Sequence, residues 1–412
     1  MNRFLTLIRT EDALEQLAVF PPGETEEVDA RRACGRVAAA DIRAPTDVPS
    51  FARSNMDGFA VVAADLENAT ESTSVTLRVS GQVAMGEAAV CAVERGCAAR
   101  ISTGGMMPDG ADSVVIHEHT ESLANGTVLV RTHVAPGENV VLAGEDMRRG
   151  ELIFSPGRRF KGGDVGALTG MGLDRVSVYR RPTVGVIVSG DEIVEPGTRL
   201  EPGQVYNANE HALASLVRRC GAQAKCYGVI PDDETRLLAA FERAVADNDV
   251  VLVSGGSSKG PRDLTRRTIE SLPDANVLFH GVAIAPGKPT ILARVGSTAV
   301  MGLPGNPAAV VVVFTILCST LIRIIGGEIL GQVLATRPFV RARLLEDKAS
   351  TPGREDYVRV KITPGDPVPV VTPLAGKSVA MSTIARADGL MRIPRACEGV
   401  RAGETVDVLL LD

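Results

Sequence analysis

Three loops in the second half of the chain place glycine, hydroxyl and acidic residues directly after apolar runs. Ser189-Gly190-Asp191-Glu192 follows the run 183–188, the loop 254–260 follows the run 249–253, and the loop 302–307 opens an apolar segment. Glycine-rich loops and helix N-termini expose backbone N–H groups that bind anions such as phosphate. In open α/β sheets, ligands bind beyond the carboxyl ends of the strands, so these loops predict a phosphate site at one sheet edge.

A phosphate site of this kind combines backbone donors with a cation. The segment 285–289 lies between the second and third loops and carries Lys288, which can reach a phosphate or another oxyanion. Asn306 suits an N-cap and Pro307 a first helical residue, so a helix N-terminus is expected there. The loop 254–260 matches neither a Walker A loop nor a dinucleotide fingerprint, and alone it is also typical of a flexible turn. The predicted anion contacts are Ser189, Gly190, Asp191, Ser254, Gly255, Gly256, Ser257, Ser258, Lys259, Pro286, Gly287, Pro304, Gly305, Asn306 and Pro307.

Five carboxylates follow strands of the same expected sheet, namely Asp191, Glu192, Asp232, Asp233 and Asp263. Oxygen ligands beside phosphates are the usual means by which proteins hold Mg²⁺. Their convergence therefore predicts a magnesium site at the phosphate edge. Each carboxylate taken singly is also typical of a loop residue or a helix cap, and Asp233 and Asp263 each precede an expected helix.

The first half of the chain, from about residue 28 to 179, shows short strands with frequent turns. The Asn125-Gly126 pair predicts a hairpin. Polar turns at 54–60, 101–105 and 144–146 are, by spacing alone, typical of ordinary turns. His117 and His119 would share one strand face and could form half of a metal site, but no third ligand is near in sequence, so an exposed strand face is expected.

From about residue 180, apolar strands alternate with helices. Strands are expected at 183–188, 224–229, 249–253 and within 291–301, and helices at 209–220, 233–248, 263–271 and from 307 onward. This alternation predicts a mostly parallel sheet with helices on both faces. After Gly326-Gly327 strands return at 339–345, 356–362, 368–372 and 406–411, which indicates a final all-β unit.

The composition argues against nucleic acid and membrane as partners. The chain of 412 residues has a net charge of −6, 3% aromatic residues and no Trp, whereas nucleic-acid surfaces are usually basic and single-strand binders stack bases on aromatic rings. The apolar run 308–322 is shorter than the roughly 20 residues a bilayer requires, so a buried helix is expected. Residues 1–19 lack a signal-peptide pattern and indicate an amphipathic helix with Thr10 as N-cap. Seven scattered cysteines indicate buried free thiols, which favours a cytoplasmic location.

Taken together, these motifs resemble the MoeA family, the molybdopterin molybdenumtransferases, which includes the E domain of gephyrin. None of the motifs is specific alone, but their combination is, because they occur in family order over essentially the whole chain. They are Asp47-Val48-Pro49, 56–60, 100–104, 110–115, 144–146, 189–192, 203–209, the loop 254–260 with Asp263, 286–289 and 302–307.

The resemblance implies an α/β plus β fold with four domains in an elongated homodimer. An extended linking domain would comprise residues 1–45 and 147–179, and a β-rich domain of residues 46–146 would be inserted into it. Residues 180–328 would form a three-layer α/β domain like that of MogA, the molybdopterin adenylyltransferase, and residues 329–412 a C-terminal β-barrel. In the family, the active cleft lies between the α/β domain of one subunit and the inserted domain of the other.

The implied reaction is the Mg²⁺-assisted insertion of molybdate into adenylylated molybdopterin, with release of AMP and formation of molybdenum cofactor. Implied partners are a second copy of the chain, a MogA-type adenylyltransferase and acceptor molybdoenzymes. By motif position, Glu192, Asp232 and Asp263 would hold Mg²⁺. The implied catalytic residues are Asp57, Thr103, Asp146, Glu192, Asp263 and Lys288.

One position departs from the family pattern. Many members have a lysine at the start of the Lys-Pro-Gly-Lys-Pro motif, where this chain has Ala285, and we expect Lys259 to replace part of the missing charge. The departure leaves three alternatives open. They are a paralogue that prefers tungstate, an enzyme like the molybdopterin adenylyltransferases, and a pterin-binding or scaffold protein without catalysis.

Overall fold

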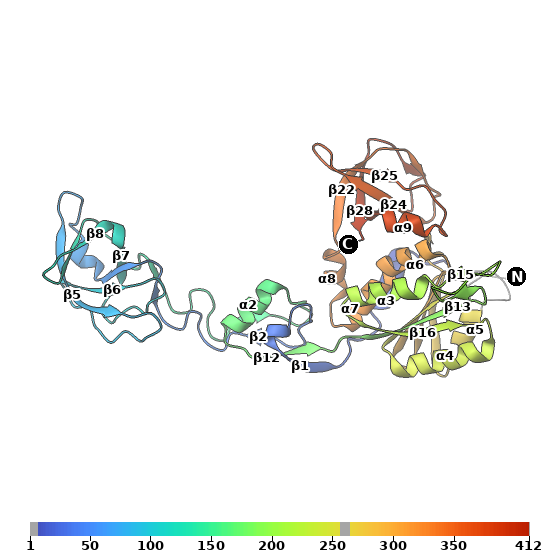
Figure 1. Ribbon diagram of the computed structural model, residues 1–412, viewed down its shortest axis with the longest axis horizontal. Coiled ribbons are helices and arrows are strands. Elements are labelled where there is room, and N and C mark those ends of the chain that lie inside the picture. Colours follow the sequence, from blue (N-terminus) through green and yellow to red (C-terminus); the bar gives the residue numbers. More distant parts are fainter. Residues whose placement is uncertain (1–6, 256–263, 412) are drawn as a thin grey trace.

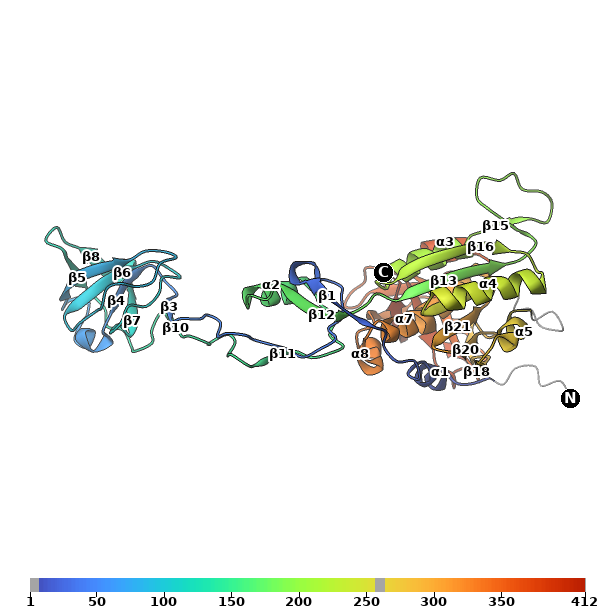
Figure 2. The same ribbon diagram turned by 90° about the horizontal axis from the view of Figure 1, so that it is seen from below.

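The computed structural model describes residues 7–255 and 264–411 and is elongated (Figure 1). A distal β module lies at one end, an α/β module and a β-barrel lie at the other, and a thin linking module joins them. The turned view in Figure 2 shows the same separation. The domain limits expected from the resemblance stay predictions, so the modules are named by the elements they contain.

The linking module pairs strands that are far apart in sequence. β1 lies antiparallel to β12, β2 lies antiparallel to β11, and their core includes Phe160, Leu168 and Val178. The chain therefore runs through this module twice, once on its way to the distal module and once on its way back. Its elements are β1 (Thr25–Asp29), η1 (Ala30–Arg32), β2 (Ile42–Arg43), β11 (Leu152–Phe154), α2 (Gly162–Gly170) and β12 (Arg175–Tyr179).

The distal module is a six-stranded sheet in the order β7-β4-β6-β5-β9-β8, with Phe59, Leu77 and Val115 in its core. A short ribbon, β3 paired with β10, leads into it. The hairpin predicted at Asn125-Gly126 is confirmed, because β8 and β9 pair antiparallel around it. The elements are β3 (Arg53–Ser54), β4 (Gly58–Val61), η2 (Ala63–Leu66), β5 (Val75–Val83), β6 (Cys97–Ile101), β7 (Ser113–Ile116), η3 (His117–His119), β8 (Thr120–Ser122), β9 (Thr127–Val130) and β10 (Val140–Val141).

The prediction that His117 and His119 share a strand face is wrong. They lie in η3, a single 3₁₀ turn, in which successive side chains do not alternate between two faces. The ring of His117 packs edge-on against Phe59 at 5.5 Å, so this histidine supports the sheet.

The α/β module contains the predicted mostly parallel sheet, in the order β16-β13-β17-β21-β20-β18. The pairs β13–β16, β13–β17 and β17–β21 are parallel, and β20 and β18 close one side antiparallel. The strands are β13 (Thr183–Ser189), β16 (Gln223–Ile230), β17 (Val250–Ser254), β18 (Ala275–His280), β20 (Ile291–Val295) and β21 (Thr298–Leu303), with the short β14 (Ile193–Val194), β15 (Val205–Tyr206) and β19 (Ile284–Ala285) in loops.

Helices cover both faces of this sheet, which confirms the three-layer prediction. One face packs on α1 (Thr10–Leu17), α3 (Asn209–Arg219) and the helical run from Pro307, and the other packs on α4 (Glu234–Asp247) and α5 (Leu264–Ser271). The helical run consists of α6 (Pro307–Val313), the π-helical turn η4 (Phe314–Cys318) and α7 (Ser319–Ile325). Pro307–Ile325 is long and apolar enough to cross a membrane by length and composition, yet 78% of its apolar window is buried in the structure, as predicted for a core helix.

The C-terminal module is the predicted β-barrel. β24, β25, β22, β28 and β26 pair in that order, and β24 also pairs with β26, so the ring closes. β19 of the α/β module adds alongside β24 and joins the two modules. The elements are α8 (Leu330–Ala335), β22 (Phe339–Leu344), β23 (Lys348–Ala349), β24 (Glu355–Thr363), β25 (Val370–Pro373), α9 (Met381–Arg386), β26 (Gly389–Ile393), β27 (Gly399–Val400) and β28 (Thr405–Leu410).

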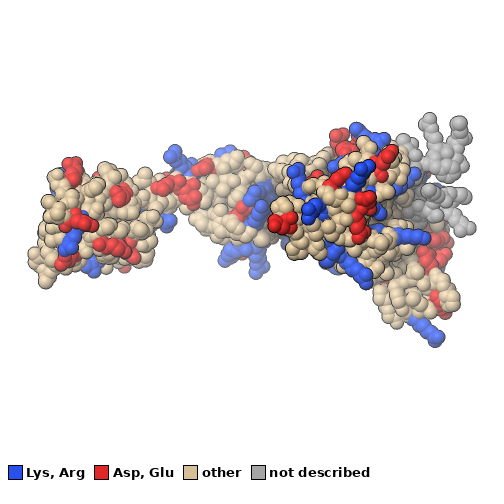
Figure 3. Space-filling model, turned by 90° about the horizontal axis from the view of Figure 1, so that it is seen from above, with Lys and Arg blue, Asp and Glu red and all other residues tan. Residues whose placement is uncertain are grey.

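Two smaller predictions need correction. Arg9, and not Thr10, is the N-cap of α1, and the hydroxyl of Thr10 is buried without a hydrogen bond in the described structure. All seven cysteines are free, but Cys34 and Cys226 are exposed and only Cys97 and Cys318 are buried. Acidic and basic side chains are interspersed over the face of the molecule seen in Figure 3, in keeping with the modest net charge.

Candidate functional site

The three predicted loops meet at one edge of the α/β sheet. Parallel pairing places Val188 opposite Ser254 and Ser254 opposite Leu303, so β13, β17 and β21 end together. The buried side chain of Asn209, at the start of α3, joins two of the loops. Its Nδ2 donates to the Ser254 hydroxyl and to the Gly305 carbonyl, both at 2.8 Å. Its Oδ1 is buried and has no hydrogen-bond partner in the described structure.

Five of the predicted residues lie at the end of β13 and in the neighbouring loop after β16: Ser189, Gly190, Asp191, Glu192 and Asp232. The buried Ser189 hydroxyl donates to Asp232 Oδ1 at 2.6 Å, and the Asp232 backbone N–H donates to Asp191 Oδ1 at 3.1 Å. A Cβ on Gly190 would lie 2.8 Å from Glu192 Oε2, so the Glu192 side chain folds back over this glycine. The carboxylates of Asp191, Glu192 and Asp232 are exposed, whereas the groups that position them are buried.

The backbone at Gly255 leaves no room for a side chain. Its φ is 106°, and a Cβ there would lie 2.1 Å from the Ser189 backbone oxygen. The first two loops are therefore in direct backbone contact, which is the close approach that glycine permits. The Thr265 hydroxyl donates to the Gly255 carbonyl at 2.9 Å and fixes the loop from the side of α5.

The helix predicted to start at Pro307 does start there, with Asn306 in the N-cap position. The Asn306 side chain makes no capping hydrogen bond, however, and its Nδ2 donates instead to the Ser378 hydroxyl at 2.9 Å. The backbone N–H of Ala308 donates to the Ser378 carbonyl at 3.1 Å. The barrel module therefore uses one of the donors at this helix end, and the anion contact predicted here stays a prediction.

The loop 285–289 brings Lys288 to the same edge. β20 runs antiparallel to β21, with Ile291 opposite Gly302, so the residues that precede β20 lie beside the end of β21. Gly287 packs on α6, where a Cβ would lie 2.6 Å from Val313 Cγ2. The Lys288 side chain is exposed, and the described structure shows no ion pair for it. Lys288 is therefore an exposed cation at the rim of the site, which suits an anion contact.

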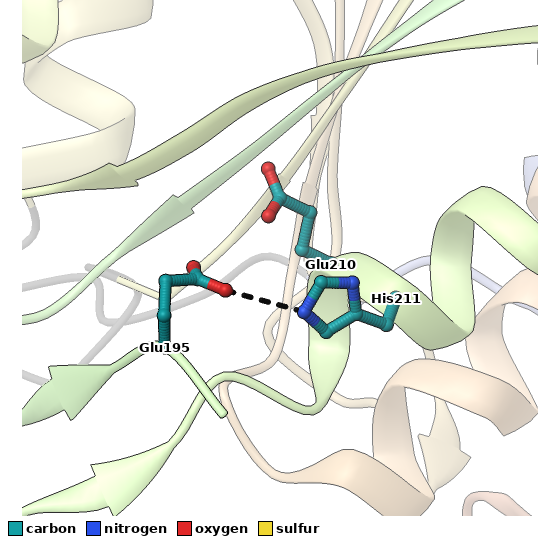
Figure 4. Close-up of side chains that lie close together, drawn as sticks. All are labelled: Glu195, Glu210 and His211. Carbon is teal, nitrogen blue, oxygen red and sulfur yellow. Dashed lines mark hydrogen bonds and ion pairs between the residues drawn. The ribbon is translucent and has the colours of Figure 1, made fainter. Parts of the chain in front are cut away.

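One group of three potential metal ligands occurs within the described ranges, and it is not the predicted one. Glu195, Glu210 and His211 place one ligand atom each within 4.8 Å of one another (Figure 4). The Asn207 amide donates to both carboxylates, at 2.7 and 3.0 Å, and the Gly228 N–H donates to Glu210 Oε1 at 2.7 Å. These hydrogen bonds explain why the three side chains lie together. The cluster holds in place the loop that leads into α3.

Three predicted catalytic residues lie in or next to the distal module. Asp57 Oδ1 accepts a hydrogen bond from the Thr103 backbone N–H at 2.7 Å, so these two residues are neighbours. Asp146 lies where the chain leaves this module, with its N–H bonded to the Val48 carbonyl at 3.0 Å. All three are exposed, and Figure 1 shows the linking module between them and the α/β sheet. Within one chain they do not meet the carboxyl edge.

Several predicted residues cannot be placed. Gly256, Ser257, Ser258, Lys259 and Asp263 lie outside the described residues. Their assignment to phosphate and Mg²⁺, and the compensation of Ala285 by Lys259, remain predictions.

The sequence did not point to three residues that shape this site: Asn209, Ser378 and Arg359. Arg359 is 9% exposed, and its Nη2 donates to the Gly376 carbonyl at 2.7 Å, which holds the loop that carries Ser378. Burial lowers the pKa of Arg359. For Asn209 a signal existed, because it ends the motif 203–209 directly before a helix. For the two barrel residues, nothing in the local pattern indicated a contact with α6.

Family models cover most of the chain. Residues 8–172 match the MoeA N-terminal region (domain I and II), residues 185–323 match a probable molybdopterin binding domain, and residues 341–411 match the MoeA C-terminal region (domain IV). The three matches follow one another in the order in which the modules occur along the chain.

Curated relatives and solved structures agree with these matches. A putative molybdopterin biosynthesis protein of Methanocaldococcus jannaschii is 32% identical over 94% of this chain and 92% of its own length. The molybdopterin molybdenumtransferase of Haemophilus influenzae is 34% identical over 76% of each chain. The crystal structure of a molybdopterin biosynthesis MoeA protein from Pyrococcus horikoshii matches with a TM-score of 0.82 and 37% identity, and covers 99% of this chain and 100% of that one.

Proposed function

The chain belongs to the MoeA family and is a transferase of molybdenum cofactor biosynthesis, and on that premise we propose that it inserts molybdate into adenylylated molybdopterin and releases AMP. The observation that carries the proposal is the Asn209 bridge between Ser254 and Gly305. It holds two glycine-containing loops together at the carboxyl edge, where a phosphoanhydride can receive backbone hydrogen bonds without side chains in the way.

Each part of the edge has a distinct role in this proposal. The loops at Gly255 and Gly305 bind the phosphates of the adenylylated pterin, and Lys288 contacts the same anion or molybdate from the rim. The barrel residue Ser378 fixes the start of α6 and so sets the floor of the phosphate site. Water cleaves the phosphoanhydride and AMP leaves, and the two dithiolene sulfurs displace one oxo ligand of molybdate, which takes up two protons and leaves as water.

The carboxylates in and beside the first loop fit Mg²⁺. Asp191, Glu192 and Asp232 supply exposed oxygens, the ligands this ion prefers, and one oxygen of Asp232 is oriented by the Ser189 hydroxyl. Bound there, Mg²⁺ would screen the charge that develops as the phosphoanhydride is cleaved. Glu192 and Asp232 are the described members of the proposed ligand set.

We further propose that the active unit is a homodimer. Asp57 and Thr103 form a hydrogen-bonded pair at the far end of the molecule, so they reach a carboxyl edge only on a second copy. Co-expression of Asp57→Ala and Lys288→Ala chains tests this. Random pairing makes half of the dimers mixed, each with one intact site, so about a quarter of wild-type turnover returns. Inactive mixed dimers would contradict the shared site.

The insertion assay tests the reaction itself. Purified protein is given adenylylated molybdopterin, Mg²⁺ and molybdate, and AMP release and cofactor formation are followed. Release of both products is expected, and a parallel reaction with tungstate measures the oxoanion preference. Consumption of ATP with unmodified molybdopterin would instead favour adenylyl transfer, and tight pterin binding without AMP release would favour a non-catalytic role.

A further inference from the structure

A cavity of ≈ 280 Å³ lies where the linking, α/β and barrel modules meet. The linking module contributes Arg159, the barrel contributes residues of β28, and the α/β module contributes the last turn of α3 with parts of η4 and α7. α3 starts at the carboxyl edge and ends at this cavity. Its 11 residues span about 16 Å, so the cavity is separate from the proposed active site.

Four arginines line this space, which we call the arginine cavity: Arg159, Arg219, Arg323 and Arg337. Arg159 and Arg323 share a single carboxylate, Glu328, with N···O distances of 2.6 Å for each. No acidic side chain belongs to the described lining. Two guanidinium groups against one carboxylate leave one positive charge uncompensated.

Arg337 supplies a second uncompensated charge. Its Nη2 donates to the Ile316 carbonyl and to the Thr320 hydroxyl, both at 2.6 Å, and neither acceptor is charged. A guanidinium has five N–H donors, so about three remain on Arg337, and they have no partner in the described part of the chain. Burial lowers the pKa of Arg337, a cost that an anion in the cavity would offset.

Apolar side chains also line the cavity, and part of its wall has an unusual backbone conformation. Leu216, Phe314 and Val333 face the cavity, and Phe314 starts the π-helical turn η4. Such single π turns are rare and are frequent at functional sites. Here the Ile316 carbonyl of the π-helical turn accepts a hydrogen bond from Arg337. The irregular turn and the arginine that lines the cavity are therefore in direct contact.

We propose that the arginine cavity binds a small organic phosphate. A phosphate monoester carries a charge of about −1.5 to −2 at neutral pH, which matches the two uncompensated charges, and its oxygens accept forked hydrogen bonds from guanidinium groups. The cavity has room for on the order of ten non-hydrogen atoms, so an apolar group fits beside the phosphate. Because three modules form the walls, an occupant ties them together.

Calorimetric titration of the full chain with phenyl phosphate tests this. Saturable binding is expected, with weaker binding of inorganic phosphate, which lacks the apolar group, and weaker binding of phenol, which lacks the charge. Equal affinity for phenol would show an apolar pocket only, and equal affinity for inorganic phosphate would show that the apolar wall contributes nothing. Either result overturns the proposal, as does the absence of binding.

Variants locate the site. Arg337→Gln is expected to weaken phenyl phosphate binding about tenfold or more, because a charge-assisted hydrogen bond is lost. Ser319→Leu narrows the cavity and keeps every arginine, so it is expected to weaken the binding of phenyl phosphate, which needs most of the space, even if Arg337→Gln fails to fold. Arg341→Gln removes the same charge from an arginine on β22 that is 73% exposed, and is expected to bind like the wild type.

The phenyl phosphate titration and the insertion assay can fail independently of each other. Binding that survives unchanged in Ser319→Leu would overturn the assignment to this cavity. The insertion assay on Ser319→Leu is expected to give wild-type turnover, since the variant leaves the carboxyl edge intact. An inactive wild-type protein in that assay would contradict the proposed function and leave the titration result as it stands.

Discussion

Replacement of Asn209 by alanine tests the site most directly, because one side chain holds two of its loops. In Asn209→Ala the hydrogen bonds to the Ser254 hydroxyl and the Gly305 carbonyl disappear, while the backbone of α3 is unchanged. Ser254 keeps a weaker contact, its hydroxyl lying 3.3 Å from the Pro304 carbonyl. The loops therefore lose their bridge without losing the strands that carry them.

The expected loss of stability is small. Two neutral hydrogen bonds contribute about 1 kcal/mol each. Against this, the variant also removes the buried Oδ1 that has no partner in the described structure, and an unsatisfied buried acceptor costs about 1 kcal/mol or more. The net destabilisation is about 1 kcal/mol, or about 2–4 °C in melting temperature for a unit of this size. Asn209→Asp, which turns a charged oxygen toward the Gly305 carbonyl, should cost several kcal/mol.

Turnover should fall much further than stability. Misplacement of a binding loop by about 1 Å can cost on the order of 100-fold in rate, so Asn209→Ala is expected to lose 10- to 100-fold in kcat/KM of the insertion assay. Asn248→Ala is the matched control. Its Nδ2 also donates twice at 2.8 Å, to Tyr227 and Ala244, and its Oδ1 is also unpartnered, but it precedes β17 at the opposite edge. Equal turnover of the two variants would refute the role of Asn209.

Three further predictions rest on single contacts. Gly255→Ala should abolish pterin binding, measured by calorimetry, because a Cβ there would lie 2.1 Å from the Ser189 oxygen, whereas Gly228→Ala, also at positive φ but with open space around it, should bind. Burial raises the pKa of Glu328, but hydrogen bonds and charges from Arg323 and Arg159 outweigh burial and hold it below the usual 4.5. The stabilisation by ionised Glu328 is then present above about pH 4.5 and is lost as the pH falls through the lowered pKa. The melting temperature of Glu328→Gln should therefore depend less on pH in that range than the melting temperature of the wild type does. In thiol labelling of the native protein at pH 8, Cys34 should react first and Cys226 more slowly, because partial burial of the Cys226 thiol raises its pKa although the residue is exposed. The buried Cys318 should react only after unfolding, and its early reaction would contradict that burial.

The carboxyl edge was predictable because it follows from strand direction alone. Apolar runs such as 183–188 and 249–253 alternate with helices, and parallel strands necessarily end together. The prediction of Asp233 as a helix cap is confirmed for the same reason, since its carboxylate accepts the Arg236 N–H at 2.8 Å, three residues away. Local rules of this kind need no knowledge of the tertiary structure.

The contacts of Ser378 and Arg359 were not predictable, since they depend on how the barrel packs against α6. Ser378 lies about 70 residues beyond Asn306, and no periodicity links the two. The same packing explains a contact at the start of α6 that the sequence did not predict. The start of α6 has the residues of an anion-binding helix, yet the Ser378 carbonyl accepts the Ala308 N–H. Of the anion donors, the loop glycines therefore matter more than the helix end, and Ser378→Gly, which keeps the carbonyl, should disturb binding less than Gly255→Ala.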